Sequence, residues 1–192
     1  MKKLAFFLIC SILTIGSSLH AQSFDVGMLD KAMTMLGNGK QAESAGILKQ
    51  ATGLLTKETK MAKGDFGKKL GLPLQGLTSM LPALSKGTAD VSKVQGLVSK
   101  VKMIVGAMGM RKMLDGGSLL GKGAAVAQNV GLLKSGLGTL GSGPEVSQIT
   151  KSLDKVTKKM PKLGKTGFFA KMAQKAISKK LGSSLGLLKG LI

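Results

Sequence analysis

Apolar residues recur every three or four positions along almost the whole of this chain, and this spacing constrains the fold more than any other feature. It places apolar side chains on one face of a helix, whereas a half-buried strand needs alternation with a period of two. The clearest series is Val91, Val94, Val98, Val101, Val105 and Met108. No segment shows a convincing period of two. The sequence therefore predicts an all-α protein.

Glycine and proline divide the apolar stripes into about six or seven short helices, which predicts an irregular, Gly-rich bundle. Residues 64–71 are expected to form a loop, Pro73 to occupy the first turn of the next helix, and Pro82 to bend or end it. The other predicted helix boundaries are Gly37-Asn38-Gly39, Gly116-Gly117, Pro144 and Pro161. Two further sets of small residues recur every four positions and are expected to allow close helix packing. These sets are Gly117, Gly121 and Ala125, and Gly182, Gly186 and Gly190.

The first 21 residues have the organisation of a bacterial export signal. Lys2 and Lys3 precede an apolar run that ends at Ile15, and a short polar stretch follows as far as Ala21. The run is too short to span a bilayer, which takes about 20 residues. Cys10 follows a bulky isoleucine, which argues against a lipoprotein site. We expect residues 1–21 to be cleaved, and the mature chain to begin at Gln22 and to be periplasmic or secreted.

Cleavage would remove the chain's only histidine and only cysteine, and the remainder has no Trp or Tyr. Residues 22–192 are expected to form a single helical domain that folds by packing alone, without disulfides. A histidine-dependent catalytic triad is excluded in this mature chain, and zinc would lack its usual nitrogen and sulfur ligands. No acidic residues recur at a spacing that would pair them for catalysis. We therefore expect no enzyme activity, no metal and no cofactor.

Two glycine-rich stretches, 136–141 and 116–123, approach the spacing of nucleotide-binding loops. Both motifs need a preceding strand, and the second also lacks a Ser or Thr after Lys122. A cluster of four methionines is a candidate Cu(I) site, because thioethers bind Cu(I), but methionine is also a common core residue. The cluster consists of Met103, Met108, Met110 and Met113. We favour a structural role for these methionines.

The mature chain would carry 27 basic and nine acidic side chains, a net charge of +18. Only Arg111 is an arginine. Because lysine is a hydrated point charge without the planar fork of arginine, delocalised attraction to an anionic surface fits better than sequence-specific recognition of nucleic acid. The aromatic residues on which single-stranded bases could stack are few. They are Phe24, Phe66, Phe168 and Phe169.

Charge is distributed unevenly, because residues 155–192 contain ten lysines and no acidic residue after Asp154. Residues 163–192 are predicted to form a basic amphipathic helix, with Thr166 as a candidate cap. The predicted cationic positions are Lys151, Lys155, Lys158 and Lys159 on one helix and Lys171, Lys175 and Lys179 on the last. The predicted apolar face of the last helix comprises Phe169, Met172, Ile177, Leu181 and Leu188.

A helix with one apolar and one lysine-rich face is typical of helices that lie on membrane surfaces. The sequence therefore favours a non-enzymatic exported protein that binds membrane lipid or lipopolysaccharide through its lysines. The alternative is a structural protein that docks its helices with a protein partner in the cell envelope, where the lysines serve only solubility. Salt would weaken the first kind of binding and leave the second largely intact.

Overall fold

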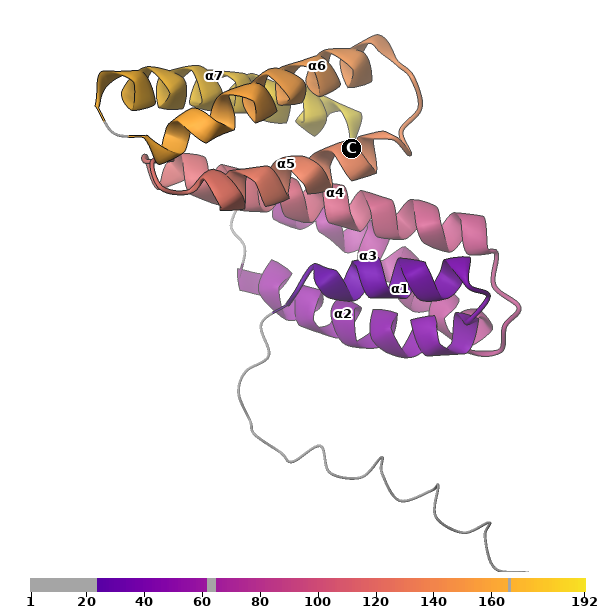
Figure 1. Ribbon diagram of the computed structural model, residues 1–192. Helices are drawn as coiled ribbons and strands as arrows, with labels where there is room; N and C mark the ends of the chain where they lie inside the picture. Colours follow the sequence, from indigo (N-terminus) through magenta and orange to yellow (C-terminus); the bar gives the residue numbers. More distant parts are fainter. Residues whose placement is uncertain (1–23, 62–64, 166) are drawn as a thin grey trace, which may run out of the picture.

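The computed structural model describes residues 24–61, 65–165 and 167–192, which form seven α-helices and one 3-10 helix and no strand (Figure 1). The all-α prediction is confirmed, whereas the predicted signal peptide lies outside the described residues. The elements are α1 (Gly27–Gly37), α2 (Gln41–Met61), α3 (Asp65–Ser85), α4 (Val91–Asp115), α5 (Gly123–Leu137), α6 (Pro144–Lys159), η1 (Met160–Gly164) and α7 (Phe168–Leu191).

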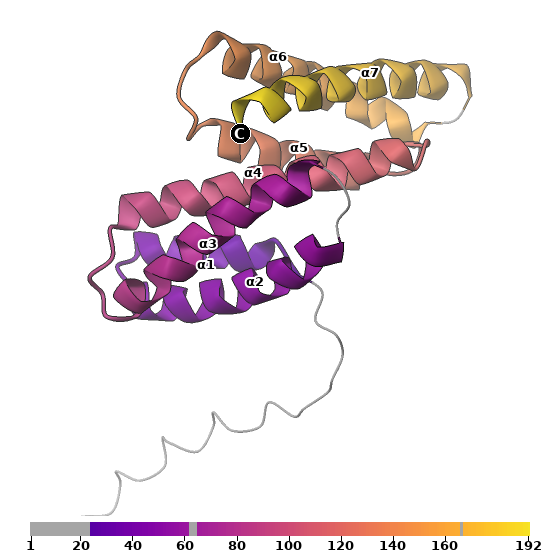
Figure 2. The ribbon, with the colours of Figure 1, turned by 180° about the vertical axis from the view of Figure 1, so that it is seen from behind.

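Helix α4 lies at the centre of the bundle, with α1, α2 and α3 on one side and α5, α6 and α7 on the other (Figures 1 and 2). Its predicted stripe is buried at Val94, Val98 and Val101. A second side of the helix is buried as well, at Met103 and Met110. The sequence predicts one buried face for this helix, but contacts with α1, α3, α5 and α7 cover more than one.

Most predicted helix boundaries agree with the structure. Helix α4 ends immediately before Gly116, α6 begins with Pro144 in its first turn, and η1 contains Pro161. Asp90 caps α4, because its side chain accepts a hydrogen bond from the Lys93 amide at 3.2 Å. Sequence reasoning recovered the glycine and proline signals, which act within one helical turn, but it did not single out the Asp90 cap.

Helix α3 corrects two of the predictions. Residues 65–71, expected in a loop, are helical, and Pro73 and Pro82 both lie inside the helix. An interior proline removes a backbone hydrogen bond and disfavours helix by about 3 kcal/mol. Burial of the continuous stripe Phe66, Leu70, Leu74 and Leu77 offsets this cost.

Close helix packing occurs at glycines other than those expected. At Gly136 in α5, an added Cβ would lie 2.2 Å from the Met103 Cβ, and at Gly106 in α4 it would lie 2.8 Å from the Leu132 Cβ. In contrast, a Cβ at Gly182, Gly186 or Gly190 would have no neighbour within 4 Å. Gly117 and Gly121 are not helical at all, because they adopt positive φ angles of 78° and 73° in the α4–α5 connection.

An ion pair between α1 and α4 places a charge close to the core. The Lys102 ammonium lies 2.5 Å from the Asp30 carboxylate, and the lysine side chain is only 11% exposed whereas that of Asp30 is 61% exposed. The aliphatic part of Lys102 packs in the bundle and its charged end reaches the surface at Asp30.

We expect Asp30→Asn to lower the free energy of unfolding by about 2 kcal/mol, because it leaves the charge of a mostly buried lysine side chain without its counter-ion. Lys102→Met keeps the packing and removes the charge, so it is expected to be neutral or stabilising. Urea unfolding followed by far-UV circular dichroism measures both effects. In the double variant Asp30→Asn, Lys102→Met, the loss of stability caused by Asp30→Asn should disappear. A loss of the same size in the double variant would contradict this account.

Candidate functional site

Helices α6 and α7 form an antiparallel pair whose apolar stripes are turned into the bundle (Figure 1). On α7, Ile177 and Leu181 are fully buried and Leu188 is 1% exposed. On α6, Leu153 and Val156 are fully buried as well. Most of the apolar surface that the sequence assigns to the last helix is therefore part of the protein core.

The structure separates Phe169 and Met172 from the rest of the predicted apolar face. Their exposed fractions are 73% and 55%, respectively. With about 3.6 residues per turn, Met172 lies about 140° around the helix from Ile177 and only about 60° from Lys175. These two apolar side chains therefore share the outer surface of α7 with its lysines.

The start of α7 carries an exposed aromatic patch, which consists of Phe168, Phe169 and Met172. The two phenyl rings contact each other edge to face, with centroids 6.0 Å apart. Phe168 is 71% exposed. Exposed apolar patches on a folded protein commonly mark contact sites for membranes or proteins. Sequence reasoning did not assign a role to Phe168.

The seven predicted lysines lie along α6 and α7. Lys151, Lys155 and Lys158 are exposed on α6, on the side opposite its buried stripe. Lys159 is half-buried, whereas Lys171, Lys175 and Lys179 on α7 are exposed. Within the described ranges, none of these seven side chains forms an ion pair. The last acidic side chain, Asp154, is already paired with Lys134 at 2.6 Å. The positive charge of this surface is therefore uncompensated.

The segment between α6 and α7 adds two lysines that the sequence analysis did not single out. Lys162 and Lys165 are exposed, and the buried Leu163 anchors η1 in the core. The sequence placed the start of the amphipathic helix at residue 163, but residues 160–164 form η1 and α7 begins at Phe168. The expected cap, Thr166, lies outside the described residues.

The α4–α5 connection packs against this end of the molecule. The Gly121 amide donates a hydrogen bond to the Leu163 carbonyl at 3.3 Å, and the Gln174 side chain donates one to the Gly117 carbonyl at 3.0 Å. Figure 1 shows the end of α6, η1, the start of α7 and this connection gathered at one end of the bundle. We call this region the cationic end, defined by Lys158, Lys159, Lys162, Lys165, Lys171, Lys175 and the aromatic patch.

The remaining sequence candidates lie elsewhere. Met103 and Met110 are fully buried in the core, whereas Met108 borders a cavity. The glycine-rich stretch 136–141 spans the end of α5 and part of the following connection. Residues 116–123 span the α4–α5 connection and the first residue of α5. The described part of the chain has no strand before either stretch. Among the described residues, no group of three or more His, Cys, Asp or Glu side chains could hold a metal ion.

Comparisons with protein-family models, with curated proteins and with solved structures find no match for this chain. Within residues 24–61, 65–165 and 167–192, every helix is too short or too polar to cross a bilayer.

Proposed function

We propose that this is an exported, non-enzymatic protein that attaches to anionic membrane surfaces, formed by lipid or lipopolysaccharide, through its cationic end. One observation carries the proposal. Three large apolar side chains, Phe168, Phe169 and Met172, are exposed among unpaired lysines in a stretch without acidic residues. Leaving apolar side chains in water has no folding benefit, whereas a partner that is apolar inside and anionic outside would contact both groups at once.

Electrostatic attraction would bring the cationic end to the surface. Each lysine close to an anionic membrane contributes about 1 kcal/mol, and the effect decays within a Debye length of about 8 Å at physiological ionic strength. Three exposed lysines of α7, at 171, 175 and 179, lie on one side of that helix. Those of η1 and the end of α6 lie nearby, so several charges can approach one surface together.

Apolar insertion would then hold the protein in place. Transfer of a phenylalanine side chain from water into an apolar phase is favourable by about 1.5–3 kcal/mol. Phe168 and Phe169 are each more than two-thirds exposed, at 71% and 73%, so most of this free energy is available on binding. Charge attraction and insertion together would give reversible attachment without a membrane-spanning helix.

The alternative is a protein partner in the cell envelope that packs against the same aromatic patch. A packed apolar interface would depend little on ionic strength, and it would not need the surrounding lysines. Salt dependence therefore distinguishes the two functions on one preparation of protein.

The chain that begins at Gln22 is expected to float with vesicles that contain phosphatidylglycerol at low salt and to dissociate largely at high salt. Neutral phosphatidylcholine vesicles are expected to bind much less. Liposome flotation measures the bound fraction directly. Equal binding to both kinds of vesicle, or binding to neither, would favour the protein partner instead.

The double variant Phe168→Ser, Phe169→Ser tests insertion separately from charge, and it is expected to reduce the bound fraction on anionic vesicles severalfold. Leu72→Ser is the matched control, because Leu72 is 77% exposed on α3, away from the cationic end. Far-UV circular dichroism checks that both variants keep their helices. Full binding by the double variant would show that the lysines act alone and that the aromatic patch has another role.

A further inference from the structure

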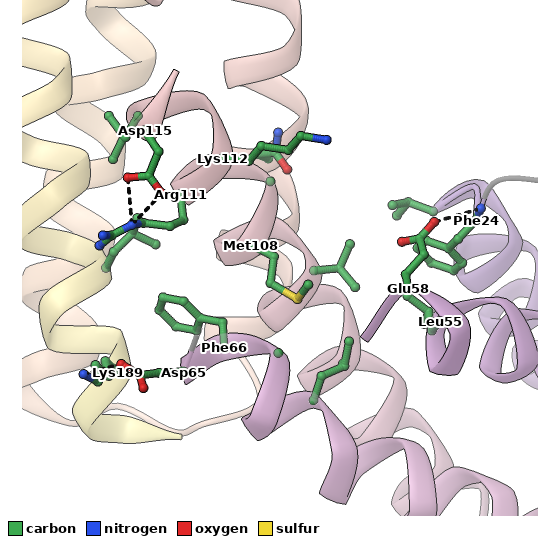
Figure 3. Close-up of a pocket in the computed structure, with 18 of the residues that line it drawn as sticks. Phe24, Leu55, Glu58, Asp65, Phe66, Met108, Arg111, Lys112, Asp115 and Lys189 are labelled. Atoms are coloured by element: carbon green, nitrogen blue, oxygen red, sulfur yellow. Dashed lines mark hydrogen bonds and ion pairs between the residues drawn. The ribbon is translucent and has the colours of Figure 1, made fainter. Parts of the chain in front are cut away.

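A cavity of about 1050 Å³ lies between the start of α3, the C-terminal half of α4 and the C-terminal half of α7 (Figure 3). The end of α2 and the residues just before α1 border it on the far side. Its volume is slightly above the range for small-molecule sites, about 300–1000 Å³. The residues of α7 that line the cavity lie in its C-terminal half, whereas the cationic end includes only the start of α7. A ligand site in this cavity therefore does not depend on the proposed function.

The walls of the cavity are mainly apolar. Leu55, Phe66, Leu70, Val105, Met108 and Leu185 contribute side chains from four helices. Gly182 and Gly186 line the cavity on α7 and have no side chain to occupy it, and an added Cβ at either would have no neighbour within 4 Å. Nothing in the described chain fills the space above these glycines. The walls therefore suit a flexible apolar chain.

The charged groups at the rim are mostly paired with one another. Asp65 lies 2.5 Å from Lys189, and Arg111 lies 3.0 Å from Asp115. The hydrogen bond from Lys189 and the charge of that ammonium group lower the pKa of Asp65 below its ordinary value, which favours the ionised form of this carboxyl group. Both carboxylates are thus satisfied within the protein.

Lys112 and Glu58 are the two charged groups of this rim that form no ion pair among the described residues. In Figure 3 the side chain of Lys112 extends from α4 into the space that separates α4 from Phe24 and Glu58. Glu58 on that opposite side accepts a hydrogen bond from the Phe24 amide at 3.3 Å. An unpaired ammonium beside apolar walls is complementary to a molecule with an acidic head and an apolar tail.

We propose that this cavity binds a single-chain amphiphile with an acidic headgroup, of which a long-chain fatty acid is the simplest case. The apolar tail would lie between α3, α4 and α7, over Gly182 and Gly186. The headgroup would contact the Lys112 ammonium at the rim. Binding involves no covalent step.

The test uses 11-(dansylamino)undecanoic acid, whose fluorescence rises and shifts to the blue in an apolar site. The chain from Gln22 has no Trp or Tyr that would contribute background emission. We expect saturable binding that oleate displaces. A fluorescence change that does not saturate, or that oleate does not reverse, would overturn the proposal.

Variants on α7 test the location of the site. Gly182→Leu and Gly186→Leu place a side chain into the cavity, with no contact to disturb, and together they should weaken probe binding by about tenfold or more, or about 1.4 kcal/mol. Gly190→Leu is the matched control, because Gly190 has the same open surroundings but does not line the cavity. Unchanged binding in the double variant would overturn the proposal. So would loss of probe binding in the Phe168→Ser, Phe169→Ser variant, because it would place the probe at the cationic end.

The headgroup is tested with Lys112→Gln and a pair of competitors. Lys112→Gln is expected to weaken displacement by oleate several-fold and to leave displacement by oleyl alcohol unchanged, because the alcohol has no charge for Lys112 to bind. Equal losses for the two competitors, or none for either, would overturn the assignment of Lys112 to the headgroup. Far-UV circular dichroism and the Gly190→Leu control separate all these results from a failure to fold.

Discussion

Gly136→Ala is expected to destabilise the protein by about 3 kcal/mol, toward the upper end of the cost of overpacking a core. An alanine Cβ at this position would lie 2.2 Å from the Met103 Cβ and 2.7 Å from the Ser99 carbonyl oxygen. The second of these neighbours is backbone and cannot move aside by a rotamer change. Helices α4 and α5 would therefore have to separate, and α4 is the helix around which the bundle is arranged.

Gly131→Ala is the matched control, and its effect on the free energy of unfolding should have the opposite sign. It lies in the same helix, it is exposed, and an added Cβ there has no neighbour within 4 Å. Alanine favours helix over glycine by about 0.5–1 kcal/mol, so this variant should be stabilised by up to that amount. Urea unfolding followed by far-UV circular dichroism compares the two variants. Stabilisation by Gly136→Ala would show that α4 and α5 do not pack as closely as described.

Local signals in the sequence predict most of the helices correctly. The stripe Met28 to Leu36 with its terminal Gly37-Asn38-Gly39 matches α1 (Gly27–Gly37), and Pro144 matches the first turn of α6. These features succeed because an apolar stripe and a cap are set by residues within one or two helical turns of each other. No knowledge of the neighbouring helices is needed.

The failures have long-range causes. In α3, the sequence around Pro73 reads as a helix start, and only burial against α2 and α4 explains why the helix begins eight residues earlier, at Asp65. In α4 and α5, Gly106 and Gly136 are close contacts because two particular helix faces meet. The sequence of a helix does not show which other helix its face will contact. The spacing of glycines therefore could not distinguish Gly106 and Gly136, which make close contacts, from Gly182 and Gly186, which are open.

The candidate site was predictable in its charge but not in its geometry. A run without acidic residues after Asp154 is visible in the sequence and locates the unpaired lysines. The exposure of Met172 could have been found by measuring its angle from Ile177 around the helix. Phe169 lies about 80° from Ile177, the same angle as the buried Leu185, so this measurement does not reveal its exposure. The cavity could not have been found, because its walls come from segments that only the fold brings together, such as Phe66 and Leu185.

The triple variant Lys171→Glu, Lys175→Glu, Lys179→Glu is expected to abolish binding to anionic vesicles at physiological salt. Loss of three lysines near the surface removes about 3 kcal/mol, or more than a hundredfold in affinity, and the new carboxylates add repulsion. The fold should tolerate the changes, because all three side chains are exposed and none forms an ion pair in the described part of the chain. Glutamate at 171, in the first turn of α7, also suits the positive end of the helix dipole.

A second triple variant, Lys31→Glu, Lys49→Glu, Lys57→Glu, changes the net charge by the same amount on α1 and α2. These three lysines are also exposed, but they lie in the half of the bundle opposite the cationic end. If attachment is localised as proposed, this variant should keep most of its binding, because its changed side chains are not those of the cationic end that contact the surface. Liposome flotation of both variants beside the parent protein measures the difference. Equal loss in the two variants would mean that net charge alone drives association, and it would remove the assignment of function to α6, η1 and α7.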